Sequence, residues 1–168
     1  MPEAAQTISI TDDSGLLSLV DVSCYSPFVS EEWTYEEILR HFERQMVIKS
    51  MLVWECGDGG GTYSIVVRRG ITSEAGVREV LGSIVASADA LHVVSYDALT
   101  MAAQFQDEKL PSRHEASAVI SVAPGPYRVR VVQKFDPSRI ANTKSPDFLI
   151  ELEPGEGPQW SGVPWLRT

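Results

Sequence analysis

Four glutamates fall within a run of seven residues, with two large aromatic side chains between them: Glu31, Glu32, Trp33, Tyr35, Glu36 and Glu37. Carboxylates near the first turn of a helix complement the positive end of its dipole, and each stabilises the helix by about 0.3–1 kcal/mol. Two of the four suffice for that role. The surplus carboxylates and the rings beside them are suited to contact a basic protein, so we interpret these six residues, the acidic patch, as a partner-binding surface. The alternative is helix stabilisation alone.

A second group of charged residues lies on predicted strands. Arg128, Arg130 and Lys134 share one face of a strand, and Arg68 and Arg69 end another. Such a face is either solvated or binds an anion or an acidic group of a partner. The second interpretation of the protein is therefore a small-molecule-binding or enzymatic β-sandwich with a pocket between its sheets. The candidate residues for this anion site or pocket are His92, Tyr96, Arg128 and Arg130.

The sequence carries none of the common catalytic or cofactor motifs. The glycine-rich segment at residues 57–61 is followed by a predicted strand instead of a helix, and it lacks the lysine of a triphosphate-binding loop. The three histidines, His41, His92 and His114, are not spaced as metal ligands. A site assembled by folding, such as His114 with a nearby acid, is left open. We expect no catalytic site, no metal and no cofactor.

The two cysteines, Cys24 and Cys56, lie in or at the end of apolar segments, where a free thiol behaves as a small hydrophobic group. They are too few for a disulfide framework, which favours a cytoplasmic protein. The first residues lack the basic and apolar regions of a secretory signal, and no apolar run is long enough to span a membrane.

The net charge of −9 is concentrated at one end of the chain. Residues 1–60 hold eleven acids and three bases, whereas residues 61–168 hold twelve acids and eleven bases. Such a field repels nucleic acid and anionic membranes, and it steers a basic partner toward the N-terminal third. The alternative role of this charge is solubility.

The acidic patch begins the clearest helix signal. Thr34 precedes Glu37 by three residues, which is the spacing of a capping box, where each side chain accepts a hydrogen bond from a backbone N–H of the first turn. An apolar stripe at helical spacing follows: Ile38, Leu39, Phe42 and Met46. We predict one helix, over residues 35–46.

Apolar segments, several of them alternating with polar residues, predict eight or nine strands. They lie at residues 8–10, 16–25, 48–54, 62–69, 79–86, 90–96, 118–122, 127–135 and 148–153. We expect residues 57–61 to form a hairpin loop, and residues 97–107 fit a short helix or a strand equally well. Without helices between successive strands, a parallel arrangement is disfavoured. We therefore predict a mainly-β fold, an antiparallel two-sheet β-sandwich with one flanking α-helix.

We expect residues 1–168 to form a single β-sandwich domain, because the length suits one domain and no linker-like segment divides the chain. Residues 1–7 are small and polar, which predicts a flexible tail. Residues 154–168 are rich in proline and glycine, which predicts an irregular tail. Because Trp160 and Trp165 are costly to expose, we expect this tail to pack on the body.

The order of these elements resembles the bacterial competence protein J family, which comprises small, acidic, β-rich proteins. The resemblance is carried by a first strand at Ile8–Ile10, by Trp33-Thr34 before a charged helix, by a strand at Met51–Trp54, by Leu110-Pro111, and by the turn Pro124-Gly125-Pro126-Tyr127. Residues 94–105 and 127–137 also resemble segments of uncharacterised bacterial proteins related to that group. The similarity covers residues 8–137 and leaves out residues 147–168.

The best-known role in that family is inhibition of a partner nuclease. The resemblance therefore implies an immunity or inhibitor protein that covers a basic nuclease or toxin without turnover, and it carries over no catalytic residues. The charge distribution agrees, because nucleases are basic where they hold phosphate and an acidic protein associates rapidly with such a surface. Under this interpretation the acidic patch is the contact surface, and neither nucleic acid nor membrane is bound.

Overall fold

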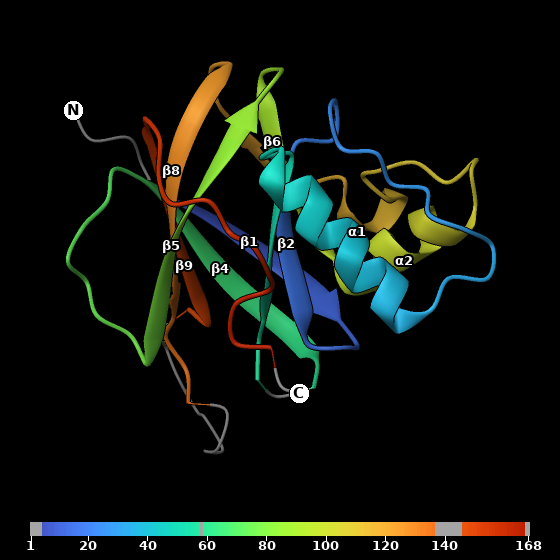
Figure 1. Ribbon diagram of the computed structural model, residues 1–168. Coiled ribbons are helices and arrows are strands. Elements are labelled where there is room, and N and C mark those ends of the chain that lie inside the picture. The colour runs from blue at the N-terminus through green and yellow to red at the C-terminus, as the bar shows by residue number, and fades with distance from the viewer. Residues whose placement is uncertain (1–4, 58, 137–145, 167–168) are drawn as a thin grey trace.

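The computed structural model describes residues 5–57, 59–136 and 146–166, which form nine strands, two α-helices and one 3-10 helix (Figure 1). The elements are β1 (Gln6–Asp12), β2 (Leu16–Val20), α1 (Tyr35–Val47), β3 (Met51–Glu55), β4 (Gly61–Arg69), β5 (Arg78–Ala86), β6 (Ala90–Ser95), α2 (Tyr96–Gln104), η1 (Arg113–Glu115), β7 (Val119–Ser121), β8 (Gly125–Gln133) and β9 (Phe148–Pro154). The predicted mainly-β, two-sheet fold is confirmed.

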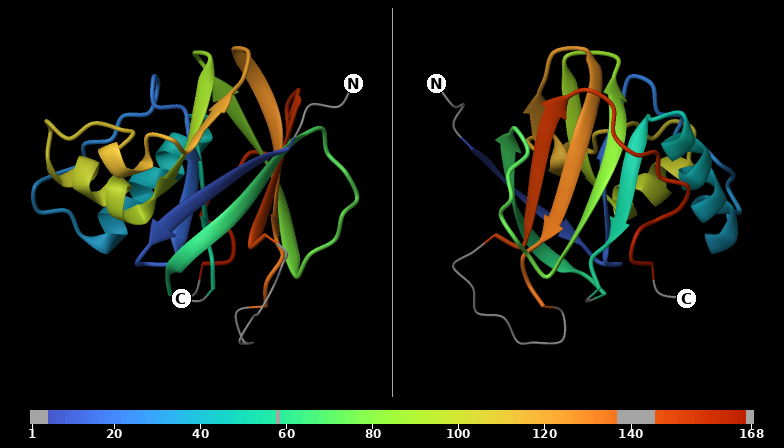
Figure 2. Two further views of the ribbon diagram at one scale, coloured as in Figure 1. Left: turned by 180° about the vertical axis from the view of Figure 1, so that it is seen from behind. Right: turned by 60° about the vertical axis from the view of Figure 1, so that its left-hand side comes forward.

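The strands form two open sheets that face each other (Figure 2). The five-stranded sheet has the order β1-β4-β9-β8-β5, and the four-stranded sheet has the order β3-β2-β6-β7. Neighbouring strands run antiparallel, except that β4 and β9 pair in parallel, with Ile65 opposite Phe148. The parallel pair is compatible with the predicted lack of βαβ units, because residues 70–147, nearly half of the chain, separate these two strands.

The core lies between the sheets and under the helices. Its centre is an aromatic cluster in which the Phe148 ring lies 5.6 Å from Phe135, 5.7 Å from Tyr63 and 6.0 Å from Trp54, measured between ring centroids. Trp54 belongs to the four-stranded sheet and Phe148 to the five-stranded one. The edge-on contact between Trp54 and Phe148 therefore helps to fix the two sheets against each other.

Helix α1 forms where the capping signal predicts it, and it ends one residue later, at Val47. The Thr34 hydroxyl accepts from the Glu37 N–H at 3.2 Å. The apolar stripe of Ile38, Phe42 and Met46 is buried, and α1 packs chiefly on β3. Both helices lie on the outer side of the four-stranded sheet (Figure 2), and among the described residues no helix could span a membrane.

A second helix, α2, corrects the prediction of a single helix. The sequence of residues 97–107 suits a helix or a strand, and contacts from other parts of the chain select the helix. The Ser95 hydroxyl caps it by accepting from the Ala98 N–H at 3.2 Å. The buried carboxylate of Asp12 accepts from the Tyr96 N–H at 2.9 Å across 84 residues, so β1 supplies part of the cap.

The strands on either side of the glycine-rich segment belong to different sheets, which corrects the predicted hairpin. The strand before it, β3, pairs with β2, whereas the strand after it, β4, pairs with β1 and β9. A Cβ on Gly60 would lie 2.7 Å from the carbonyl carbon of Asp13. Gly60 also has φ +129, so both its backbone angle and the close approach to the β1–β2 turn favour glycine.

The structure describes part of each of the two predicted tails. Residues 1–4, 167 and 168 of the predicted tails lie outside the described residues. Gln6 and Thr7 belong to β1 because their backbones pair with β4, so strand structure extends into the predicted N-terminal tail. The irregular segment after β9 reaches both sheets, since Trp160 Nε1 donates to Leu81 O in β5 at 2.9 Å and Glu55 N in β3 donates to Pro164 O at 3.3 Å.

Candidate protein-binding site

The acidic patch lies where the chain enters α1. The Thr34 hydroxyl also donates to Glu37 Oε1 at 3.1 Å, so Glu37 takes part in the cap. Glu36 and Glu37 occupy the first turn, where carboxylates complement the helix dipole. Helix stabilisation thus accounts for two of the four glutamates.

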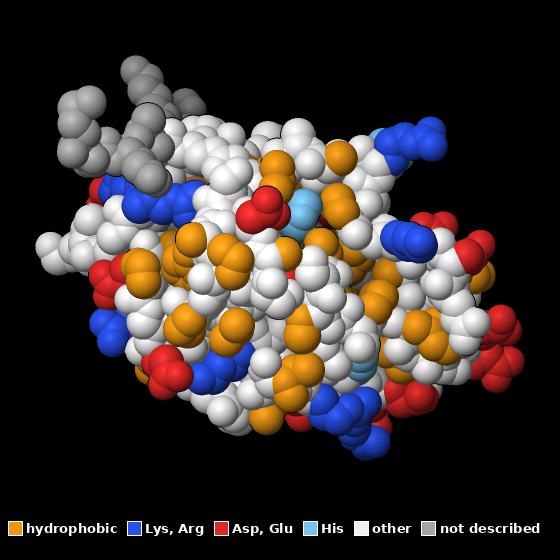
Figure 3. All heavy atoms as spheres, turned by 90° about the horizontal axis from the view of Figure 1, so that it is seen from above, with side chains coloured by type: hydrophobic (Ala, Val, Ile, Leu, Met, Phe, Trp, Pro, Cys, Tyr) orange, Lys and Arg blue, Asp and Glu red, His pale blue; other side chains and the backbone are white. Residues whose placement is uncertain are grey.

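Glu31 and Glu32 precede the helix. Both are exposed, and within the described parts of the chain neither pairs with a lysine or arginine. The ion pair in the patch joins Glu36 to Arg40 at 3.7 Å, with side chains 83% and 66% exposed. Such a pair is weak, so the patch keeps most of its negative charge. Carboxylates lie along the right-hand edge of the space-filling view, on the helix side (Figure 3).

The two aromatic residues of the patch differ in exposure. Trp33 is partly buried against the core, whereas the Tyr35 side chain is 49% exposed at the first position of α1. Burial, and then the charge of Glu55, raises the pKa of Tyr35. Tyr35 lies beside a hollow of about 360 Å³, which the sequence did not predict because its lining comes from five separate segments: Ser14, Leu16, Tyr35, Glu55, Tyr96 and Leu166.

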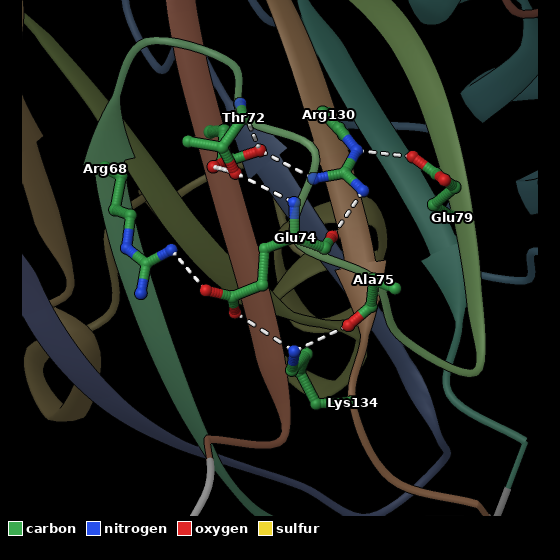
Figure 4. A network of polar contacts seen from close by, with 8 residues as sticks. Arg68, Thr72, Glu74, Ala75, Glu79, Arg130 and Lys134 are labelled. Atoms are coloured by element: carbon green, nitrogen blue, oxygen red, sulfur yellow. Dashed lines mark hydrogen bonds and ion pairs between the residues drawn. The ribbon is translucent and has the colours of Figure 1, made fainter.

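The structure does not bring the residues of the second predicted site together. His92 lies half-buried in β6, where burial lowers its pKa, and Tyr96 begins α2 directly after that strand. Arg128 lies on β8 in the other sheet and pairs with Glu153 on β9 at 2.9 Å. Arg128 and Arg130 are two residues apart and therefore share one face of β8. On this face Arg130 lies under the loop at residues 70–77 (Figure 4), whereas Arg128 donates to the carbonyl of Glu156. Helix α2 lies on the outer side of the other sheet (Figure 2).

Arg130 is only 5% exposed. The two alternatives considered from the sequence, a solvated strand face and an anion-binding site, both require an accessible guanidinium group. Its Nη1 donates to Glu151 Oε1 at 2.7 Å, its Nε donates to Glu79, and its Nη2 donates to the carbonyl of Glu74 (Figure 4). The fully buried Glu151 also accepts from the Thr72 hydroxyl at 2.6 Å. The chain's own carboxylates therefore occupy the place of the predicted anion.

The same network ties the loop at residues 70–77 to the sheet. Glu74 accepts from Arg68 Nη1 at 2.7 Å and from Lys134 Nζ at 3.0 Å, and Lys134 also donates to Ala75 O (Figure 4). Hydrogen bonds from Arg68 and Lys134 lower the pKa of Glu74, and the hydrogen bond from Arg130 lowers that of Glu79. The sequence signal for this network was the glutamate at position 151, which lies between Ile150 and Leu152 in an apolar strand.

Another hollow, of about 310 Å³, lies beside α2 and contains polar groups that already bind each other. The Ser95 N–H donates to Glu115 Oε1 at 3.1 Å, and the Ser95 hydroxyl donates to Glu115 Oε2. His114 lines the same hollow. In the described part of the chain no cluster of three or more histidine, cysteine or acidic side chains could hold a metal ion.

The fold and the patch together describe a β-rich protein of two open sheets, with an acidic, partly aromatic surface at the start of α1. No family model and no curated protein matches the sequence. Two solved structures match the fold over 92% of this chain and 99% of theirs. One is described as crocagin biosynthetic gene J, with a TM-score of 0.62 and 19% identity. The other is ComJ from Bacillus subtilis, an inhibitor of the DNA-degrading activity of NucA, with a TM-score of 0.55 and 11% identity.

At these identities the likeness establishes a common fold. It confirms the resemblance to the competence protein J family at the level of structure. The match spans 92% of this chain, so the shared fold extends over most of the arrangement described above.

Proposed function

We propose that this protein is a non-catalytic acidic binding protein of the immunity or inhibitor type, which covers the basic surface of a nuclease or toxin. The observation that carries the proposal is the group of exposed carboxylates before and within the first turn of α1, of which Glu31 and Glu32 serve neither the helix cap nor an ion pair to a described base. Their charge is available to a cationic partner.

Two independent features support this function. The first is the fold shared with ComJ, which inhibits the nuclease NucA. The second is the net charge of −9, most of which lies in residues 1–60. A nuclease is basic where it holds phosphate, so an acidic protein both reaches that surface quickly and competes with nucleic acid for it. Since inhibition by occlusion requires no turnover, no catalytic group is part of the proposal.

A cytoplasmic location belongs to the same proposal. Cys24 is exposed and Cys56 is buried, and both are free thiols. Free cysteines are typical of reducing compartments. A nuclease inhibitor inside the cell would protect the cell's own nucleic acid from its partner.

The experiment compares binding and inhibition by charge-reversal variants. A basic nuclease captured stoichiometrically from native cells is assayed for DNA cleavage with added wild-type protein or with Glu31→Lys/Glu32→Lys. We expect the double variant to bind at least tenfold more weakly and to show a flatter dependence of affinity on salt, because two attractive charges become repulsive.

The matched control carries the same change of net charge elsewhere. Asp89 and Asp107 are exposed on other loops, so Asp89→Lys/Asp107→Lys should keep wild-type inhibition. Equal affinities for the patch variant and the wild type would rule out the acidic patch as the contact surface. Equal losses in both double variants would reduce the patch to a contribution to net charge.

A further inference from the structure

The hollow beside the acidic patch joins the first residues of both helices. Tyr35 begins α1, Tyr96 begins α2, and both side chains line the hollow, whose volume is about 360 Å³. Phe42 holds the Tyr96 ring in an edge-on contact at 6.5 Å between centroids. Tyr35 is half-exposed, so the hollow, hereafter the tyrosine hollow, is bounded by one fixed ring and one accessible ring.

Glu55 lines the tyrosine hollow and its negative charge acts on Tyr35, so the electrostatic environment of the hollow favours a cation. Burial and the nearby charges of Tyr35, Asp12 and Asp97 raise the pKa of Tyr96 to about 12. Asp97 is held in place because its Oδ2 accepts from the Asp13 N–H at 3.0 Å. No lysine or arginine is among the described residues that line the hollow.

The shape and the lining select a particular kind of cation. Leu16 and Leu166 provide apolar wall, which suits an aliphatic stem. Two tyrosines also line the hollow, and a cation is attracted to the face of a tyrosine ring. A planar guanidinium stacks on aromatic rings and is more weakly hydrated than an ammonium group, so arginine suits this lining better than lysine.

We propose that the tyrosine hollow receives one arginine side chain of the basic partner, beside the contact made by the acidic patch. This inference rests on the proposed function for the identity of the partner. The hollow then supplies an anchor that fixes the orientation of the partner, whereas the exposed glutamates chiefly increase the rate of encounter.

The test uses a small probe and no partner protein. Nα-acetyl-arginine amide is titrated into the full-length protein while NMR follows the ring and backbone signals of Tyr35 and Tyr96. Nα-acetyl-citrulline amide, which has nearly the same shape but no charge, is the matched ligand control. We expect saturable shifts at both tyrosines with the arginine probe, and at least threefold weaker binding of the citrulline probe.

Variants of the exposed ring test its part in binding. Tyr35→Ala should weaken arginine binding roughly two- to fivefold, the effect of an exposed cation–π contact, whereas Tyr35→Phe should retain binding because it keeps the ring. Val47→Ala, at the exposed far end of α1, is the control and should match the wild type. Equal binding of both probes, no saturable shift at either tyrosine, or wild-type affinity in Tyr35→Ala would overturn the proposal.

The probe separates this inference from the proposed function. Failure of Glu31→Lys/Glu32→Lys to weaken partner binding refutes the acidic patch and leaves the titration result unaffected. Conversely, a tyrosine hollow that does not discriminate arginine from citrulline refutes the anchor, while inhibition through the acidic patch is measured independently.

Discussion

Two arginines on β8 provide a direct measure of what burial does to an ion pair. The Arg130–Glu151 pair, at 2.7 Å, leaves 6% and 0% of the two side chains exposed. The Arg128–Glu153 pair, at 2.9 Å, leaves 42% and 33% exposed. Loss of one partner from a buried pair costs about 3–5 kcal/mol, because an unpaired charge stays in a poorly solvated place. An exposed pair contributes about 0–1 kcal/mol.

We therefore expect Arg130→Leu to lower the free energy of unfolding by about 3–5 kcal/mol, and Arg128→Leu to lower it by about 1 kcal/mol. For a chain of this size these losses correspond to falls in Tm of roughly 6–20 °C and 2–4 °C. Urea unfolding followed by circular dichroism measures the free energies, and a thermal scan measures Tm.

The double variant Arg130→Leu/Glu151→Leu separates the loss of charge pairing from the loss of packing. It removes both charges and fills the space with apolar groups, so it should be more stable than Arg130→Leu alone. Similar losses for Arg130→Leu and Arg128→Leu, or a double variant less stable than Arg130→Leu, would refute the view that an unpaired buried charge dominates the cost.

Three further predictions follow from the packing and the charges. Because ion-pair hydrogen bonds lower the pKa of Glu74 and Glu79 below the ordinary 4.5, their stabilisation is complete above pH 4.5 and is lost as the pH falls through the lowered values; acid unfolding monitored by circular dichroism should be less steep in E74Q/E79Q, and an unchanged profile would contradict this. A Cβ on Gly82 would lie 2.7 Å from the Trp160 ring, so Gly82→Ala should cost about 1–3 kcal/mol and alter tryptophan fluorescence; wild-type urea unfolding would count against the close packing. Ser95→Ala removes the cap of α2 and should cost about 0.5–2 kcal/mol in the same assay, with fully retained stability as the contrary result.

The acidic patch and strand β8 show which features a local sequence pattern can predict and which it cannot. The spacing of Thr34 and Glu37 was enough to predict where α1 begins, because the hydrogen bonds of this cap join residues of a single turn. The alternating pattern of β8 likewise predicted a strand with Arg128 and Arg130 on one face. It could not predict that a loop covers that face, because the loop residue that binds Arg130, Glu74, is 56 residues away along the chain, and the other two glutamates that bind it are 21 and 51 residues away.

The sequence by itself determined the features that depend on neighbours in the chain: the strands, the first helix and its cap, and the concentration of negative charge in residues 1–60. Only the tertiary structure decided which strands pair, that the strands on either side of the glycine-rich segment belong to different sheets, and that Asp12 helps to select a helix at Tyr96. The physical reason is that hydrogen bonds within one turn, and the alternation along one strand, are fixed by spacing. Sheet pairing and the burial of Arg130 depend on segments that meet only when the whole core forms.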